Sequence, residues 1–181
     1  EETRYAINGV LIDAAAGCVR MVATDGRRLA ISYENIETTA EFKVVVPLRA
    51  LNTLARALGE GSKDVLRIDV ADKQIVFHIG KVHLVSQLLE TRFPDYEGVL
   101  PKSAETTVEV QKNVLEGALR RAAILCSADL RMVRFEVGDQ SLRMTAESST
   151  RGRADVVTDA VVKGAGGSIN FNPDYILEAL R

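Results

Sequence analysis

The sequence predicts an α+β protein built from a repeated unit, in which a strand leads into an amphipathic helix and three more strands follow. The best-defined copy begins at residues 44–47, VVVP, where β-branched residues precede a helical pattern that Pro47 can open. The strand–helix step occurs three times, at spacings of 63 and 61 residues measured from Val45, Val108 and Ile169. Such regular spacing indicates internal repeats.

The N-terminal region reads as strands, expected at residues 4–14, 18–25 and 27–34. Asp25-Gly26 lies between two alternating apolar runs and is a strong signal for a tight turn. The first helix is predicted over 48–58 and is stopped by the glycine-rich GEGS that follows. Its apolar face is expected to comprise Leu48, Leu51, Leu54, Ala55 and Leu58.

Three strands are expected after this helix, at 65–72, 74–80 and 82–89, with turns at Asp72-Lys73 and Gly80-Lys81. The next stretch, RFPDYEGVLP, contains two prolines and a glycine and follows neither the helical nor the strand period. We therefore expect one domain over 1–92, a linker over 93–101 and a second domain over 102–181.

The second domain repeats the same plan. A strand is predicted at 106–110 and a helix at 111–125, with Leu115, Ala118, Leu119 and Ala122 on its buried face. Strands are then predicted at 132–138, 141–148 and 153–159, a GAGGS loop at 164–168, a strand at 168–171 and a helix at 173–180. Because the pattern begins and ends inside a repeat, we expect the chain to be a piece of a longer protein.

Charge is unevenly distributed. The chain has a net charge of −2, yet the helices 48–58 and 111–125 together hold five basic residues and a single acid, Glu116. A cationic helix face on an acidic body suits a protein that contacts phosphates with one surface. Exposed helix faces are often charged for solubility alone, so a merely solvated face remains the alternative.

Composition restricts the function further. Two cysteines form no disulfide framework, so a reducing, cytoplasmic compartment is expected, and no apolar run is long enough to span a bilayer. His78 and His83 lack the further ligands that a metal site requires. GAGGS lacks the lysine of a phosphate loop, and Ser127 and Asp129 have no histidine nearby in sequence. We expect no catalytic residues, no metal and no cofactor.

One apolar residue lies on the wrong side of its helix. At about 100° per residue, Ile124 falls among polar residues, opposite the buried face. It is either an incidental exposed side chain or half of a contact between subunits.

Six segments in order, ETRYAINGVL, VATDGRRLA, VVVP before a helix, RFPDYEGVLP, RRAAIL and FNPDYILEAL, resemble the bacterial sliding clamp family, the beta subunit of DNA polymerase III. The resemblance covers essentially the whole chain. It implies the DNA-clamp fold, with repeated βαβββ units, antiparallel sheets outside and helices on one face. The chain would hold the later part of the middle domain and the earlier part of the last domain.

The resemblance also implies a non-catalytic processivity factor. Two subunits would form a head-to-tail homodimer ring around double-stranded DNA, without sequence preference and without membrane contact. Short linear peptides would attach the DNA polymerase III catalytic subunit, the clamp loader and repair proteins to a groove between the middle and last domains.

Carried over by position, the resemblance assigns three sets of residues. DNA binding would involve Tyr5, Arg49, Arg56, Lys112, Arg120 and Arg121. The peptide-binding groove would be formed by Ile7, Thr24, Gly26, Arg27, Arg28, Leu29, Pro94, Val99, Leu130, Asn172 and Tyr175. The subunit interface would include Ile124 and Leu125. Gly98 and Leu130 depart from the family pattern, which often has a basic residue and an aromatic residue at these positions.

Two other classes of protein remain alternatives: an α+β interaction scaffold without DNA binding, and an enzyme whose catalytic half lies elsewhere. Salt-dependent binding to heparin would favour the clamp over the scaffold. Turnover that is lost on substitution of His78 or His83 would favour the enzyme.

Overall fold

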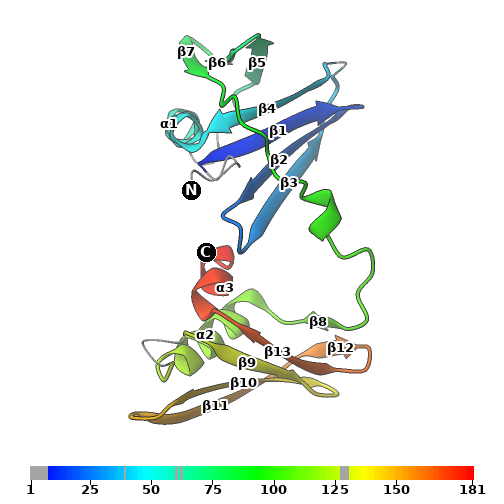
Figure 1. Ribbon diagram of the computed structural model, residues 1–181, viewed down its shortest axis with the longest axis vertical. Coiled ribbons are helices and arrows are strands. Elements are labelled where there is room, and N and C mark those ends of the chain that lie inside the picture. The colour runs from blue at the N-terminus through cyan, green and yellow to red at the C-terminus, as the bar shows by residue number, and fades with distance from the viewer. Residues whose placement is uncertain (1–7, 39, 60, 62, 127–130) are drawn as a thin grey trace. The chain divides into compact units, whose positions relative to one another are not determined.

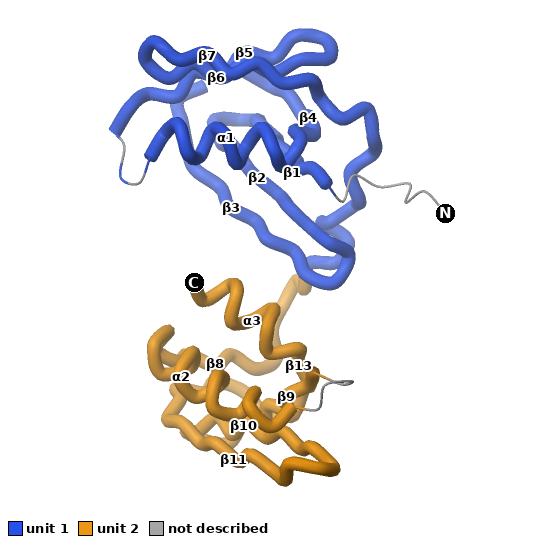
Figure 2. Tube along the Cα trace, turned by 90° about the vertical axis from the view of Figure 1, so that its left-hand side faces the viewer, with its two compact units in different colours: residues 1–100 blue, residues 101–181 orange. Residues whose placement is uncertain are grey.

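The computed structural model describes residues 8–181 except 39, 60, 62 and 127–130. The chain divides into two compact units, residues 1–100 and residues 101–181, which are coloured separately in Figure 2. Each unit has its own hydrophobic core and is described by itself.

The first sheet of unit 1 has four antiparallel strands in the order β3-β2-β1-β4 (Figure 1). These strands are β1 (Gly9–Ala15), β2 (Cys18–Thr24), β3 (Leu29–Asn35) and β4 (Phe42–Pro47). The third strand was expected to begin at residue 27. It begins at Leu29, because Arg27 and Arg28 are part of the turn that Asp25 closes with its side chain.

A second antiparallel sheet of unit 1 follows helix α1 (Leu48–Leu58). Its strands, in spatial order, are β5 (Leu66–Ala71), β6 (Gln74–Ile79) and β7 (Val82–Gln87). Helix α1 buries Leu51 and Leu54 in a core that takes Ile12 from the first sheet and Phe77 from the second.

The predicted apolar face of α1 was wrong at two positions. Leu48 is 49% exposed and Ala55 is exposed, whereas Ala50 packs against the core. The buried stripe is centred on Leu51, Leu54 and Leu58, and at 100° per residue Leu48 lies about 90° from that centre.

The opposite face of the first sheet is covered by the chain that follows β7. Tyr96 is buried there with Leu11, Val22 and Val45, and its hydroxyl accepts a hydrogen bond from Arg20 Nη1 at 3.0 Å. A short 3-10 helix, η1 (Glu97–Val99), follows. This segment, in which no helix was expected, is therefore fixed against unit 1 through Tyr96.

The described residues of unit 2 form two antiparallel sheets and two helices. The strands β11 (Gly152–Asp159), β10 (Ser141–Ser148), β9 (Val133–Val137) and β13 (Gly167–Phe171) form one sheet in that order, and β12 (Val161–Lys163) pairs with β8 (Thr107–Glu109). The helices are α2 (Lys112–Ala123) and α3 (Pro173–Ala179).

Helix α2 packs on the larger sheet through Ala118, Leu119 and Ala122, which are fully buried, while Leu115 is only partly buried. The helix ends at Ala123, two residues before the predicted end. Strand β12 was not predicted, because three residues are too few to show alternation, and pairing with β8 is what makes it a strand.

The sequences of elements β4-α1-β5-β6-β7 and β8-α2-β9-β10-β11 have the same strand–helix–three-strand plan. The prediction of an α+β fold with repeated βαβββ units and antiparallel sheets is confirmed. No helix in the described part of the chain has the length and apolar character needed to cross a membrane.

The loop before β13 supplies a stability prediction. Gly164 has a φ of +117°, and a Cβ there would lie 2.2 Å from the carbonyl oxygen of Glu105; Gly152 has a φ of +100° but open space around it. We expect Gly152→Ala to cost about 1 kcal/mol for backbone strain, and Gly164→Ala to cost about 3 kcal/mol, because overpacking is added. Urea denaturation would measure both, and equal losses would show that the crowding at Gly164 has no effect.

Candidate nucleic-acid and peptide interfaces

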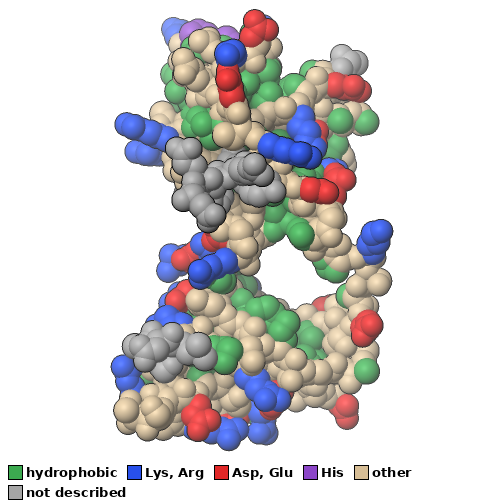
Figure 3. Space-filling model, in the orientation of Figure 1, with side chains coloured by type: hydrophobic (Ala, Val, Ile, Leu, Met, Phe, Trp, Pro, Cys, Tyr) green, Lys and Arg blue, Asp and Glu red, His purple; other side chains and the backbone are tan. Residues whose placement is uncertain are grey.

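The exposed side of α1 is cationic. Arg49 and Arg56, seven residues apart and therefore about 20° apart around the helix axis, are both exposed, and the helix contains no acidic residue. Arg56 Nε donates to the carbonyl oxygen of Asn52 at 3.2 Å, which lays its side chain along the helix. Figure 3 shows Lys and Arg side chains standing out from the surface at the level of α1. This face can contact phosphates without a local carboxylate competing for its charge.

The basic residues of α2 have more internal partners. Arg120 Nη2 lies 2.7 Å from Glu116 Oε1, one turn earlier, and this hydrogen bond lowers the pKa of the Glu116 carboxyl. Lys112 Nζ donates to the backbone carbonyl of Arg181 at 3.1 Å. Arg121 is exposed. Part of the positive charge of α2 is thus offset within unit 2.

The end of α2 and helix α3 enclose a pocket of about 600 Å³. Four arginines line it: Arg120, Arg121, Arg131 and Arg181. Arg131 is held by Asp174, with Nε 2.7 Å from Oδ2, and this ion pair raises the pKa of the guanidinium. Sequence reasoning missed Arg131, because only the fold brings the start of β9 beside α3.

Five of the predicted groove residues lie on the turn between β2 and β3 or next to it: Thr24, Gly26, Arg27, Arg28 and Leu29. Asp25 Oδ1 accepts the backbone N–H groups of Arg27 and Arg28, each at 3.0 Å, and its other oxygen pairs with Arg28 Nε at 2.9 Å. The backbone bond from Arg27 is the main cause of the lowered pKa of Asp25. Thr24 Oγ1 accepts from Gly26 N at 3.1 Å and donates to the carbonyl of Arg28 at 2.8 Å. These side-chain hydrogen bonds therefore hold the turn in one conformation.

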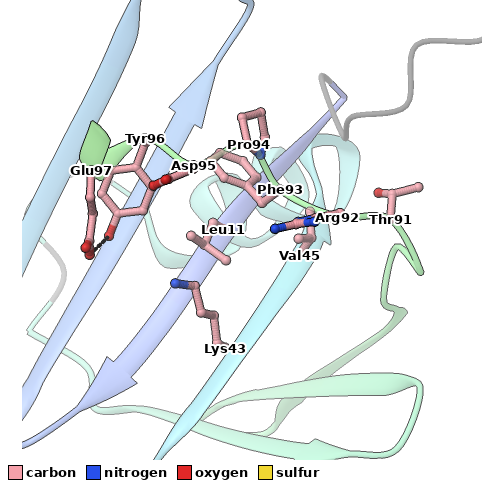
Figure 4. Close-up of a pocket in the computed structure, with 10 residues that line it drawn as sticks. All are labelled: Leu11, Lys43, Val45, Thr91, Arg92, Phe93, Pro94, Asp95, Tyr96 and Glu97. Atoms are coloured by element: carbon pink, nitrogen blue, oxygen red, sulfur yellow. Dashed lines mark hydrogen bonds between the residues drawn. The ribbon is translucent and has the colours of Figure 1, made fainter. Parts of the chain in front are cut away.

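The remaining groove residues of unit 1 differ in burial. Leu29 is half-buried against the cluster that contains Tyr96, and Pro94 is also half-buried, whereas Val99 on η1 is 71% exposed. Pro94 lines a pocket of about 410 Å³ between residues 91–97 and strands β1 and β4 (Figure 4). Lys43 lies at the pocket, 5.9 Å from the centroid of the Tyr96 ring.

Asn172 and Tyr175, the groove residues predicted in unit 2, lie at α3. Asn172 Oδ1 accepts the backbone N–H of Asp174 at 2.9 Å, so this side chain is the N-cap of the helix. Tyr175, within the first turn of α3, is half-buried. Asn172 thus positions the helix that carries Tyr175.

The predicted interface residues follow the last turn of α2. Ile124 is 68% exposed and Leu125 is half-buried. Ile124 also lines the arginine-rich pocket described above, so an apolar patch adjoins the cationic end of α2. The predicted DNA residue Tyr5 and the predicted groove residues Ile7 and Leu130 lie outside the described residues.

Comparison with known proteins agrees with the fold over the whole chain. Residues 1–95 match the family model of the DNA polymerase III beta subunit central domain, and residues 97–181 match that of its C-terminal domain. The beta sliding clamp of Escherichia coli K12 is 35% identical over 100% of this chain and 50% of its own length. The clamp of Vibrio cholerae is 30% identical, with the same coverage.

Several solved structures of DNA polymerase III beta subunits are also similar to this chain. A DNA polymerase III beta subunit from Pseudomonas aeruginosa superposes with a TM-score of 0.90 at 31% identity, covering 99% of this chain and 50% of that one. The beta subunit from Thermotoga maritima also gives 0.90, at 26% identity, covering 96% and 47%. A Pseudomonas aeruginosa clamp bound to griselimycin gives 0.91 at 30% identity, covering 99% and 49%.

Repeated βαβββ units with helices packed on antiparallel sheets define the class of DNA-clamp folds. The chain belongs to the DNA polymerase III beta subunit family. It spans about half the length of the curated relatives it matches.

Proposed function

We propose that this chain works as part of a DNA sliding clamp, a cytoplasmic, non-catalytic processivity factor that encircles duplex DNA as a head-to-tail homodimer. Residues 1–92 would be the later part of the middle domain, residues 93–101 the linker, and residues 102–181 the earlier part of the last domain. The family match over both units supports the proposal.

The main support for DNA binding is the charge on the exposed face of α1. Its apolar stripe is buried, while Arg49 and Arg56 are exposed on a helix that contains no acid, in a chain whose net charge is −2. Concentrating positive charge on one helix face attracts a polyanion there, while the acidic remainder repels it.

Contacts of this kind reach phosphates and not base edges, so they hold a duplex without reading its sequence. Phosphate contacts are independent of sequence and weaken as salt rises, and a small number of them allows movement along the DNA. Internal pairing, such as that of Arg120 with Glu116, keeps the attraction modest.

The second role is attachment of partners through short peptides. In a groove formed by these residues, the Asp25 turn would supply a polar rim, and exposed Val99 and half-buried Tyr175 would supply apolar anchors. They would receive peptides from the polymerase III catalytic subunit, the clamp loader and repair proteins.

DNA binding by the wild-type chain tests the proposal. Fluorescence anisotropy with two labelled duplexes of unrelated sequence should give equal dissociation constants that rise steeply with salt. Binding that is absent or independent of salt would favour the interaction scaffold. A strong preference for one sequence would contradict contacts made only to phosphates.

The subunit contact gives a separate prediction. A polypeptide of residues 1–181 alone should sediment as a monomer, because these residues match the central and C-terminal domains, and the partner surface for Ile124 and Leu125 would lie in the first domain of a neighbouring clamp subunit. Ile124→Asp should change the free energy of unfolding by less than about 0.5 kcal/mol, since the side chain is 68% exposed. A tight dimer that survives Ile124→Asp in analytical ultracentrifugation would contradict this interface.

A further inference from the structure

The two histidines of the chain meet on the solvent side of the second sheet of unit 1. His78 on β6 lies directly opposite His83 on β7 in the antiparallel register, across the two-residue turn Gly80-Lys81. Their Nδ1 atoms are 2.7 Å apart and their rings are inclined by 75°. His83 is exposed and His78 is half-buried, and Figure 3 shows histidine atoms at the surface of this sheet.

A carboxylate orients the pair from the other side. His78 Nε2 lies 2.8 Å from Asp69 Oδ2, and Asp69 is held in turn by Arg67, with Nη2 3.0 Å from the same oxygen. The hydrogen bond from Arg67 is the main cause of the lowered pKa of Asp69, which keeps this carboxylate ionised. The chain of contacts therefore runs Arg67, Asp69, His78, His83.

The contact with Asp69 favours one tautomer of His78, the one with its proton on Nε2. When His78 is neutral and donates its Nε2 proton to Asp69, its Nδ1 carries a lone pair directed at His83. The two facing Nδ1 atoms then share a single proton. A metal ion can take the place of this proton and bind a lone pair from each Nδ1 when the proton of His83 moves to its Nε2.

We propose that His78 and His83 form a two-imidazole site for a late first-row divalent ion such as Zn²⁺ or Ni²⁺. Imidazole nitrogen is a preferred ligand of these ions. A ligating histidine that donates its other N–H to a carboxylate, as His78 does to Asp69, has the outer-sphere partner found at most histidine metal sites. The proposal is independent of the clamp function, and it departs from the expectation from sequence that these two histidines hold no metal.

The geometry needs only a small adjustment. Two nitrogens on a tetrahedral zinc with Zn–N bonds of 2.0–2.1 Å lie about 3.3 Å apart, so the Nδ1 atoms must separate by about 0.6 Å. His83 is exposed and follows a turn, so rotation of its side chain can supply this.

Among the described residues, no group of three or more His, Cys, Asp and Glu side chains is placed to hold a metal. Water would therefore complete the coordination shell, and the site would bind more weakly than a structural zinc site with four protein ligands.

The chain has two histidines in all, which makes a direct test possible. Long-range ¹H–¹⁵N spectra of untagged protein contain the ring signals of His78 and His83 alone. Titration with Zn²⁺ should move both rings together and saturate at one ion per chain, and Mg²⁺, which prefers oxygen ligands, should move neither. Ring signals that stay in place with Zn²⁺, or a shift of one ring only, would overturn the proposal.

Calorimetric titration of variants completes the test. His83→Gln should raise the dissociation constant for Zn²⁺ at least tenfold, and Asp69→Asn should raise it about tenfold through the lost outer-sphere contact. Cys18→Ser is the control, because Cys18 is a free thiol within the same unit. Unchanged affinity in His83→Gln, or loss of binding in Cys18→Ser, would place the ion elsewhere.

Discussion

Charge reversal of Arg49 and Arg56 together is expected to reduce duplex affinity by about 60-fold or more at 0.1 M salt. Each phosphate contact contributes about 0.9 to the logarithmic salt slope, which corresponds to about eightfold in affinity at that concentration. The losses in affinity from the two contacts multiply, and the introduced carboxylates also repel the phosphates. Both side chains are exposed on α1, so Arg49→Glu with Arg56→Glu should leave the fold intact.

A matched control separates the α1 face from net charge. Lys73→Glu with Lys81→Glu makes the same change in charge at the hairpin turns of the second sheet of unit 1. Anisotropy at 0.1 M salt should show a much smaller loss for this pair. Equal losses in the two double variants would mean that overall charge, and not the α1 face, attracts DNA.

Removal of an apolar anchor from the proposed groove is expected to weaken a clamp-binding peptide at least tenfold. Buried anchors concentrate binding energy, and loss of one typically costs about 2 kcal/mol or more. Tyr175→Ala and Val99→Asp are the preferred changes. Leu29→Asp is less suitable, because Leu29 also packs in the cluster of Tyr96 and its loss would lower the stability of unit 1.

The groove measurement needs its own control. Val85 is 56% exposed on β7, away from the predicted groove residues, so Val85→Asp makes the same kind of change at an unrelated position. Anisotropy with a labelled peptide that carries a polymerase clamp-binding motif should separate the variants, and duplex binding should stay unchanged. Peptide affinity equal to wild type for both Tyr175→Ala and Val99→Asp would place the groove elsewhere.

The repeated helices and strands could be predicted from the sequence, because alternation, turn residues and helical spacing are patterns within short stretches of chain. Alternation and turn residues located the strands around Asp25-Gly26 and Gly80-Lys81, and the three- and four-residue steps located α1 and α2. Strand β12 escaped prediction because its three residues show no alternation, and what makes them a strand is pairing with β8, about fifty residues earlier in the chain. Pairing over such distances leaves no local pattern.

The candidate sites were harder to predict from the sequence than the fold was. The cationic face of α1 follows from helical periodicity, but the pairing of Arg131 with Asp174 and the burial of Tyr96 depend on tertiary contacts. The contact between His78 and His83 could have been found from sequence. A two-residue turn at Gly80-Lys81 places these residues directly opposite each other.

The salt dependence of duplex binding tests the central claim most directly. The logarithm of the association constant, plotted against the logarithm of salt concentration, should be linear for the wild type and for the variant with Arg49→Glu and Arg56→Glu. We expect the slope of the variant to be shallower by about 1.8, which corresponds to two lost phosphate contacts. Identical slopes would show that Arg49 and Arg56 do not contact DNA and would contradict a clamp that holds its duplex through the helix faces.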